Sequence, residues 1–302
     1  MVRRSENKQT ILVTGATGNI GKEVIKQLSA IADPNILVKA AVRSPNESIN
    51  VQRRNVELVD ANYDNRQSLD SALSGIDNLF VLTPTHPKLV EFTSNLVNAA
   101  TKRSTGGPIK HIVKLSHIRA NDDPKIEIIR LHREAEKIIE ESGIPFTFLR
   151  PNFFMQNFLV YGQRINDKVS FYLPAGDGKV SFVDVRDIAA VAVKALTENS
   201  DQHAGRMYDL TGPTSLTYSQ AVEILSKESK KKMSYTNISD DAAREAMKKL
   251  GMTEWHINVV IELFNISRAG YLSAISSAVE DITGKQPISI SQFGRDYVDS
   301  FK

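Results

Sequence analysis

Short apolar runs alternate with helix-like segments along the first half of the chain. The runs are almost continuously hydrophobic, as strands buried on both faces of a sheet are, and they lie at 10–14, 36–42, 56–59, 78–83, 109–115 and 146–149. Between them, apolar residues recur every three or four positions and predict helices after residue 21 and at 67–73, 88–102 and 126–142. This alternation predicts an α/β fold built on a doubly wound parallel sheet.

The pattern loosens beyond Pro151. It predicts, in order, a short strand at 180–183, a helix at 187–196, a strand at 206–211, a helix at 217–228 and a mostly helical remainder at 229–302. We therefore expect a first domain over 1–155, to which 181–212 returns. A smaller, partly interleaved C-terminal α/β lobe is expected from 156–180 and 213–302.

Composition narrows the classes of protein. With 41% hydrophobic and 24% charged residues, the 302-residue chain is ordinary globular material. It has no cysteine, which excludes disulfides, thiolate metal sites and a cysteine nucleophile. A net charge of +3 gives no reason to expect a nucleic-acid partner. The charged N-terminus and the lack of a long apolar stretch predict a cytoplasmic protein without a membrane partner, and the six histidines lack metal-ligand spacing, so no metal is expected.

The strongest chemical signal is the segment Thr-Gly-Ala-Thr-Gly-Asn-Ile-Gly at 14–21, where the first strand turns into the first helix. Gly15 and Gly18 permit positive φ and leave no Cβ between the backbone and a ligand, and we expect Gly21 to let the helix pack close to the sheet. Backbone N–H groups at a helix N-terminus bind phosphate, and the surrounding βαβ pattern makes this a Rossmann-type dinucleotide site. The residues expected to hold the diphosphate are Gly15, Ala16, Thr17, Gly18, Asn19, Ile20 and Gly21.

This motif, together with the segments 149–157 and 183–189, resembles the NmrA-like family of atypical short-chain dehydrogenase/reductases. The resemblance implies an NAD(P)-binding Rossmann domain. The family includes NADPH-dependent quinone and dye reductases and also redox-sensing regulators without catalysis. Both kinds of function therefore stay open at this point.

The end of the second strand carries Arg43 and Ser44, where an acidic residue would select NAD. A guanidinium there can pair with the 2′-phosphate, so we expect NADP(H) to be preferred over NAD(H), although Arg43 is also compatible with an ordinary solvated loop residue. After the third strand, relatives place a Gly-Asp pair against adenine. This chain has Ala61 and Asn62 instead, and Asn62 can still hydrogen-bond the adenine.

Ligands of such sheets lie at the carboxyl ends of the strands. Thr83 and Pro84 end the fourth strand and are expected beside the ribose and diphosphate. Ser116 ends the fifth strand, nearer the nicotinamide. Each of the three is equally compatible with a plain polar or turn residue at a strand end.

The proton relay of common short-chain reductases, Tyr-x-x-x-Lys, is absent, because none of the eight tyrosines has a lysine four residues later. By its spacing, His132 falls where relatives carry a functional Lys or His directed at the nicotinamide ribose. An imidazole with a pKa near neutrality suits a proton donor, so His132 is the catalytic candidate. The alternative is an exposed helical histidine beside acidic neighbours.

The segment after the sixth strand offers two phenylalanine faces and amide groups, which suit a flat aromatic acceptor, although core packing is an equal alternative for the rings. The residues expected to bind substrate are Pro151, Asn152, Phe153, Phe154 and Asn157. Further along, we expect Asp187 to cap the following helix and Arg186 to form an ion pair.

We expect an NADPH-dependent oxidoreductase that transfers hydride to a quinone-like or other conjugated acceptor, as a monomer or homodimer. The alternative is a non-catalytic NADP(H) sensor that acts through a regulatory protein partner. The missing Tyr-x-x-x-Lys pair favours the sensor, whereas the aromatic segment favours the enzyme.

Overall fold

The computed structural model describes residues 8–31, 33–43, 55–102, 107–120, 125–165 and 167–301. The chain divides into two compact units, the first comprising residues 1–123, 129–150 and 188–208, and the second 124–128, 151–187 and 209–302. The lobe boundaries expected from the sequence stay a prediction. No described helix is both long and apolar enough to cross a membrane.

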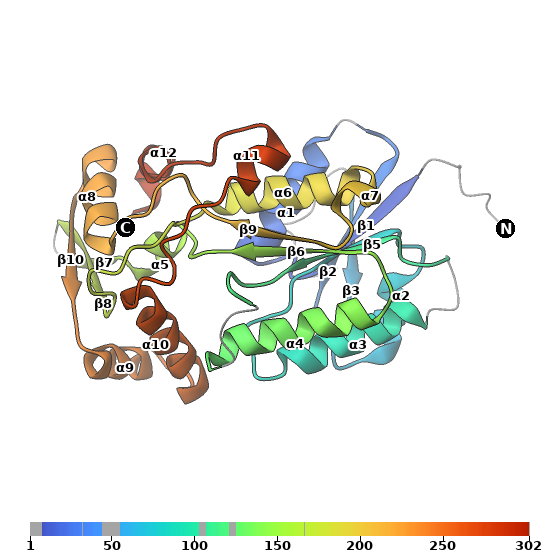
Figure 1. Ribbon diagram of the computed structural model, residues 1–302, viewed down its shortest axis with the longest axis horizontal. Coiled ribbons are helices and arrows are strands. Elements are labelled where there is room, and N and C mark those ends of the chain that lie inside the picture. The colour runs from blue at the N-terminus through green and yellow to red at the C-terminus, as the bar shows by residue number, and fades with distance from the viewer. Residues whose placement is uncertain are drawn as a thin grey trace. The chain divides into compact units, whose positions relative to one another are not determined.

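The first unit is built on a seven-stranded sheet with the order β3-β2-β1-β4-β5-β6-β9 (Figure 1). Its strands are β1 (Gln9–Val13), β2 (Ile36–Val42), β3 (Val56–Asp60), β4 (Asn78–Val81), β5 (His111–Leu115), β6 (Phe146–Pro151) and β9 (Arg206–Leu210). The pairs from β3 across to β6 are parallel. The predicted doubly wound α/β fold is therefore confirmed. Because β2 and β4 lie on opposite sides of β1, strand order reverses there, which is where ligands of such sheets bind.

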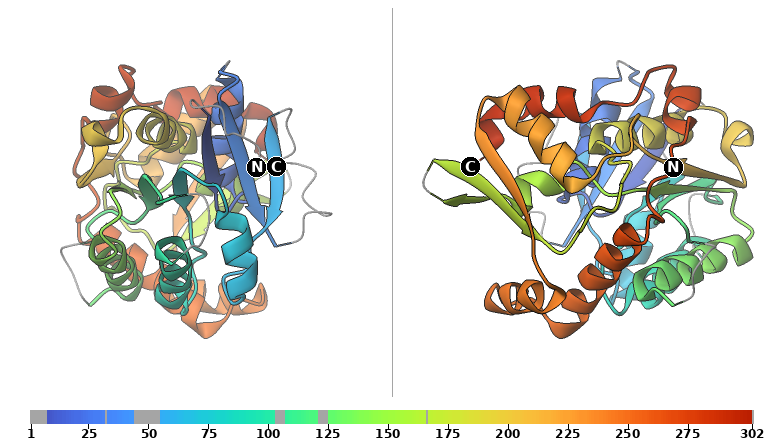
Figure 2. Two further views of the ribbon diagram at one scale, coloured as in Figure 1. Left: turned by 90° about the vertical axis from the view of Figure 1, so that its right-hand side faces the viewer. Right: turned by 60° about the vertical axis from the view of Figure 1, so that its left-hand side comes forward.

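Helices cover both faces of this sheet. Figure 2 shows α2 (Arg66–Leu73), α3 (Leu89–Thr101) and α4 (Glu127–Glu141) side by side on one face, and Figure 1 shows α1 (Asn19–Ala30) and α6 (Val185–Thr197) on the other. The short helix α7 (Ser200–His203) precedes β9. Between the sheet and α2–α4 lies a buried apolar layer that includes Leu12, Leu69, Leu73, Leu79, Leu96, Ile112, Ile139 and Phe148. Burial of these side chains positions the strand ends.

The second unit contains a three-stranded sheet with the order β10-β8-β7. Its strands are β7 (Gln163–Ile165), β8 (Lys168–Leu173) and β10 (Lys232–Asn237). Its helices are α5 (Asn157–Tyr161), α8 (Tyr218–Ser229), α9 (Asp240–Lys249), α10 (Glu254–Arg268), α11 (Ala278–Thr283), α12 (Ile290–Asp296) and the 3₁₀ turn η3 (Val298–Ser300).

Residues 232–237 form a strand, β10, within the stretch expected to be mostly helical. They pair in parallel with β8, a distant partner that local periodicity does not reveal. The expected strand at 180–183 is reduced to two isolated bridges, Val180 with Leu216 and Phe154 with Val183. Neighbouring residues there bond to different segments, so no continuous ladder forms.

Candidate functional site

The glycine turn after β1 is held by close backbone contacts. Gly15 has φ of +63°, and a Cβ there would lie 2.7 Å from a methyl of Leu82, so no other residue fits without displacement. Gly18 donates its N–H to the Gly15 carbonyl at 3.0 Å. Its φ is −79°, so of the two glycines only Gly15 uses the positive φ that glycine permits.

Gly21 has a different role from the one expected. A Cβ at this position would lie 2.2 Å from the carbonyl oxygen of Gly15. Its missing side chain therefore lets α1 approach the backbone of the turn itself rather than the sheet. This contact brings the first turn of α1 directly against the end of β1.

The N-terminus of α1 has no side-chain cap among the described residues. Gly18 occupies the N-cap position, and the first turn contains no acidic residue. Thr17, Gly18 and Asn19 are exposed, whereas Ala16 and Ile20 are buried. Uncapped N–H groups and the positive end of the helix dipole together make an anion-binding position.

The turn is tied to the neighbouring strand by Thr14. Its backbone N–H donates to the Phe80 carbonyl at 3.0 Å, and its hydroxyl accepts the N–H of Leu82 at 2.8 Å. The same hydroxyl lies 3.1 Å from the Phe80 carbonyl, to which it donates. These bonds fix the ends of β1 and β4 next to each other, at the reversal of strand order.

Five of the predicted residues follow five consecutive strands of the sheet. In spatial order along the carboxyl edge they are Asn62 after β3, Arg43 after β2, Gly15 after β1, Thr83 after β4 and Ser116 after β5. This is the order in which the sequence assigned them to adenine, 2′-phosphate, diphosphate, ribose and nicotinamide. The fold therefore brings the predicted cofactor residues of the first unit to one edge.

At the β3 and β2 end of this edge, the two strand ends are joined by the Ala61 N–H, which donates to the Val42 carbonyl at 3.0 Å. Arg43 is exposed directly after β2. Asn62 is also exposed, and its side-chain oxygen accepts the N–H of Asp64 at 3.0 Å, which leaves its NH₂ group as the donor available for adenine. Ser44 lies outside the described residues.

Thr83 combines burial with an unused hydroxyl. Its Oγ1 is buried and has no hydrogen-bond partner in the described part of the chain. The buried hydroxyls of Ser29, Ser215, Tyr218 and Ser267 also have no partner in that part of the chain, so it is the place of Thr83 at the carboxyl edge of the sheet that makes its hydroxyl a candidate for a ligand. Pro84, which follows it, is exposed.

Ser116 begins a buried polar cluster that the sequence did not predict. Its hydroxyl donates to Glu136 of α4 at 2.6 Å. The Glu136 side chain is fully buried and also accepts bonds from Arg150 Nε at 2.9 Å and Nη2 at 2.6 Å, and from Arg133 Nη1 at 3.2 Å. The bidentate arginine pair compensates the buried charge and fixes the orientation of the carboxylate on which Ser116 depends.

His132 lies in this region and is nearly completely buried, which excludes the alternative of an exposed helical histidine. Its Nδ1 lies 3.2 Å from the Nζ atom of Lys114, a fully buried lysine of β5. Burial, the Lys114 charge and His117 hold the pKa of His132 well below 6.5. The expected near-neutral pKa is therefore wrong, because His132 is a neutral imidazole at pH 7.

The sequence does contain a sign of this cluster, because charged residues stand inside elements that are otherwise buried. Lys114 stands between the apolar residues Val113 and Leu115 near the end of the expected strand 109–115, and Glu136 lies beside the apolar face of α4. A charged residue inside a buried element needs a partner, so such interruptions indicate a polar cluster.

The predicted substrate residues lie in the second unit. Pro151 and Asn152 are buried, and Phe153, Phe154 and Asn157 are half-buried. The Asn152 amide donates to Ser181 and to the Leu272 carbonyl, both at 2.8 Å, and its oxygen accepts the Phe153 N–H at 2.8 Å, so protein contacts use its hydrogen-bonding groups. The Phe153 ring lies 6.2 Å from the ring of Phe264, and Asn157 begins α5.

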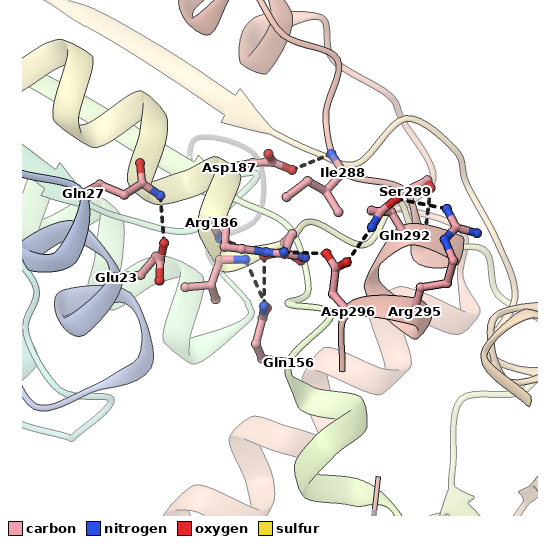
Figure 3. A network of polar contacts seen from close by, with 12 residues as sticks. Glu23, Gln27, Gln156, Arg186, Asp187, Ile288, Ser289, Gln292, Arg295 and Asp296 are labelled. Atoms are coloured by element: carbon pink, nitrogen blue, oxygen red, sulfur yellow. Dashed lines mark hydrogen bonds and ion pairs between the residues drawn. The ribbon is translucent and has the colours of Figure 1, made fainter. Parts of the chain in front are cut away.

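Asp184, rather than the expected Asp187, caps α6. Asp184 accepts the Arg186 N–H at 2.8 Å and also pairs with the Arg186 guanidinium. The expected ion pair of Arg186 is therefore present, and it extends to Asp296 at 2.6 Å (Figure 3). Asp187 instead accepts the Ile288 N–H at 2.8 Å, and its burial raises its pKa to about 6.

Among the residues that the structure describes, no group of three acidic, histidine or cysteine side chains is placed to hold a metal ion. The site thus consists of an open helix N-terminus, a row of strand-end residues and a buried cluster of hydrogen-bonded charges. Fold and edge together define a Rossmann-type nucleotide-binding protein.

The chain belongs to the NmrA-like family, which matches residues 7–283. It is 36% identical to an NAD(P)H azoreductase of Xenophilus azovorans, over 96% of this chain and 99% of that protein. It is 34% identical to the (4-alkanoyl-5-oxo-2,5-dihydrofuran-3-yl)methyl phosphate reductase of Streptomyces griseus, over 96% and 99% of the two chains. The structure of Escherichia coli quinone oxidoreductase QOR2 complexed with NADPH superposes with a TM-score of 0.81 at 26% identity, over 95% and 99% of the chains. This protein is therefore an oxidoreductase of the NmrA-like family.

Proposed function

We propose that this protein uses NADP(H) to transfer a hydride to an electrophilic, conjugated acceptor such as a quinone or an azo compound. The observation that carries the proposal is the order of Asn62, Arg43, Gly15, Thr83 and Ser116 along the carboxyl edge of the sheet. An extended dinucleotide needs groups for adenine, phosphate, ribose and nicotinamide in this sequence. The reductases of azo, furanone and quinone compounds described above support the same class of acceptor.

The residues present fit this cofactor. The uncapped start of α1 provides backbone donors for a diphosphate, and Gly15 keeps the turn free of a Cβ that would collide with Leu82. The orphaned Thr83 hydroxyl matches a ribose hydroxyl or a phosphate oxygen. When bound, the nicotinamide supplies the hydride, and the chain supplies binding and orientation.

Arg43 supports a preference for the phosphorylated cofactor. Its exposed guanidinium stands after β2, where the adenosine ribose of a dinucleotide lies. A guanidinium forms bidentate, charge-assisted bonds to phosphate that a ribose hydroxyl does not match. We therefore assign the 2′-phosphate of NADP(H) to Arg43, with Ser44 as a further donor.

The class of acceptor follows from the missing Tyr-x-x-x-Lys proton donor. No tyrosine is followed by a lysine four residues later, so the usual acid for carbonyl reduction is absent. An acceptor that is already electrophilic needs orientation more than protonation. We assign this orientation to Pro151, Asn152, Phe153, Phe154 and Asn157. The phenylalanine rings offer flat apolar faces, and Asn157 offers a half-buried amide.

The direct test measures NADPH oxidation by its near-ultraviolet absorbance with a panel of quinones and azo dyes. In parallel, fluorescence titration measures NADPH and NADH affinity. We expect turnover with at least one acceptor and tighter binding of NADPH. Binding without oxidation of any acceptor would contradict the proposed activity and favour a dinucleotide sensor. Absence of binding would contradict both functions.

A further inference from the structure

A fully buried lysine lies in the middle of the first unit, on a strand that otherwise consists of apolar residues and a buried histidine. The Lys114 side chain is 0% exposed and extends from β5. Its Nζ atom donates to the Leu115 carbonyl at 2.8 Å and lies 3.2 Å from Nδ1 of His132. Burying an ammonium costs free energy, so this lysine lowers the stability of the fold. A functional role would account for its presence at such a position.

The charges around the pair come from three elements. Glu136 lies on α4 with His132 and accepts hydrogen bonds from Arg150 of β6, from Arg133 and from Ser116. Its negative charge favours the ammonium form of Lys114 and so raises the pKa of Lys114. Arg150 opposes the Lys114 charge, and burial lowers the pKa of Lys114 to about 8. His117, in the segment after β5, stacks obliquely 6.1 Å from the His132 ring.

These charges determine the state of His132. With a pKa of about 8, Lys114 is mostly an ammonium at pH 7, which donates hydrogen bonds and cannot accept them. His132 Nδ1 must then be the acceptor, which places the imidazole proton on Nε2. The ammonium also opposes a second positive charge on the ring, in the same direction as burial.

Resting on the function proposed above, we propose that Lys114 is a positioning residue that holds His132 as the neutral Nε2–H tautomer, so that His132 offers a hydrogen bond rather than an imidazolium proton. With His132 directed at the nicotinamide ribose, as the family resemblance implies, this narrows the acceptor class. A quinone that accepts a hydride becomes a hydroquinone monoanion, a weak base, and the remaining proton is taken from water. A simple ketone would become an alkoxide, and an azo compound without an activating group would become a hydrazide anion; both are strong bases that need an acid at the moment of transfer. Unactivated ketones and unactivated azo compounds are therefore excluded as substrates.

The state of His132 is measured directly by ¹⁵N NMR of the histidine rings, with His132→Gln identifying the signal. In the wild type we expect a ring protonated at Nε2 that does not titrate between pH 5.5 and 8. In Lys114→Met we expect a mixture of tautomers and a higher pKa. Lys114→Gln can donate to Nδ1 without a charge, so it should keep the tautomer while the pKa still rises.

The matched control is Lys137→Met, which removes an exposed lysine from the same helix as His132. Its His132 signal should equal that of the wild type. A His132 signal unchanged in both Lys114 variants would overturn the proposal. The experiment needs no turnover, so it decides the role of Lys114 even if no acceptor is reduced.

Kinetics then separate positioning from a structural role. We expect Lys114→Met to lower kcat for a quinone by about tenfold while the KM for NADPH changes less than about twofold. His132→Gln, which retains an Nε2 donor, should keep more activity than His132→Leu. Equal activity of these two His132 variants, or wild-type reduction of a simple ketone at a rate like that of a quinone, would contradict the proposal. Absence of quinone and azo turnover in the wild type would instead contradict the proposed function.

Discussion

The helices α1, of the first unit, and α8, of the second, begin in different ways. In the second unit, α8 starts with a complete capping box, in which the Thr217 hydroxyl accepts the Gln220 N–H at 3.1 Å and the Gln220 side chain accepts the Thr217 N–H at 3.0 Å. In the first unit, α1 starts at Gly18, with no side-chain cap among the described residues. The donors that the protein satisfies itself at α8 stay available at α1.

Other helices show that a cap is the usual solution in this chain. Ser239, Thr253 and Ser289 cap α9, α10 and α12 through their side chains, each accepting an N–H of the first turn. A side-chain cap stabilises a helix by about 1 kcal/mol. The helices α3, α5 and α11 also begin without a side-chain cap, so the missing cap points to a ligand at α1 only together with the reversal of strand order there.

The strongest test of this comparison gives α1 the cap that it lacks. Gly18 has φ of −79°, and a Cβ there would meet nothing closer than 3.4 Å, so Gly18→Asp should fold. We expect a free energy of unfolding raised by up to about 1 kcal/mol. NADPH binding should weaken by at least about 3 kcal/mol, because a carboxylate then occupies the anion position. Denaturant unfolding and calorimetry measure the two changes.

Gly18→Asn is the matched control, because asparagine also caps but carries no charge. Its NADPH affinity should lie between those of the wild type and Gly18→Asp. Unchanged NADPH affinity in the aspartate variant would show that α1 does not hold the diphosphate.

The second prediction concerns the same edge one strand away. Arg43→Ala should weaken NADPH binding by about 1.5–3 kcal/mol, because a charge-assisted bond to the 2′-phosphate is lost, and should leave NADH binding unchanged. Fluorescence titration with both cofactors measures this. Arg66→Ala, which removes an exposed arginine of α2 paired with Asp70, is the control and should change neither affinity. Equal losses for NADPH and NADH would refute the phosphate assignment.

A third prediction concerns α6, whose cap is Asp184 and whose first turn contains the buried Asp187. The pKa of Asp187 is raised to about 6 in the folded protein, so its contribution to stability is present below about pH 4 and is lost as the pH rises through 6. In Asp187→Asn the side-chain oxygen can still accept the Ile288 N–H, but the group no longer ionises.

We therefore compare the free energy of unfolding of Asp187→Asn with that of the wild type at each pH. The difference, variant minus wild type, should be about 1–2 kcal/mol larger at pH 7.5 than at pH 4.5. Urea unfolding at the two pH values measures the difference. Asp241→Asn is the control, since Asp241 is exposed in the first turn of α9. A wild type and an Asp187→Asn variant with parallel pH profiles would contradict the assignment of the raised pKa.

The smallest expected effect concerns the capped helix, α8. Thr217→Ala removes the capping box of α8 and should lower the free energy of unfolding by about 1 kcal/mol. NADPH affinity should not change, because this cap serves stability. Guanidinium unfolding and the same NADPH titration report both quantities. A loss of NADPH affinity in this variant would remove the distinction between the two helix starts.

Much of the cofactor edge could be predicted because its signals are local. A glycine turn after an apolar run, or Arg43 after β2, is visible in a few neighbouring residues. The spatial order of these strand ends then follows from the rules for parallel sheets. The pattern did not show which glycine uses positive φ: Gly15 does, whereas the backbone of Gly18 is extended and its N–H closes the turn on Gly15.

The remainder depends on partners that are distant in sequence. The environment of His132 is determined by Lys114, eighteen residues earlier, so its lowered pKa could not follow from neighbouring residues. In the same way, β10 forms because β8, more than sixty residues away in the chain, provides its hydrogen-bonding edge. Asp184 and Asp187 lie in one short segment, and only the helix boundary at Val185 decides which of them is the cap.

Hydrogen–deuterium exchange with and without NADPH tests most directly whether α1 and α8 begin differently because one of them holds a ligand. The account predicts that saturating NADPH slows exchange in peptides covering residues 14–22 and leaves peptides covering residues 215–222 unchanged. Bound NADPH with no added protection at 14–22, or with equal protection at both helix starts, would contradict it.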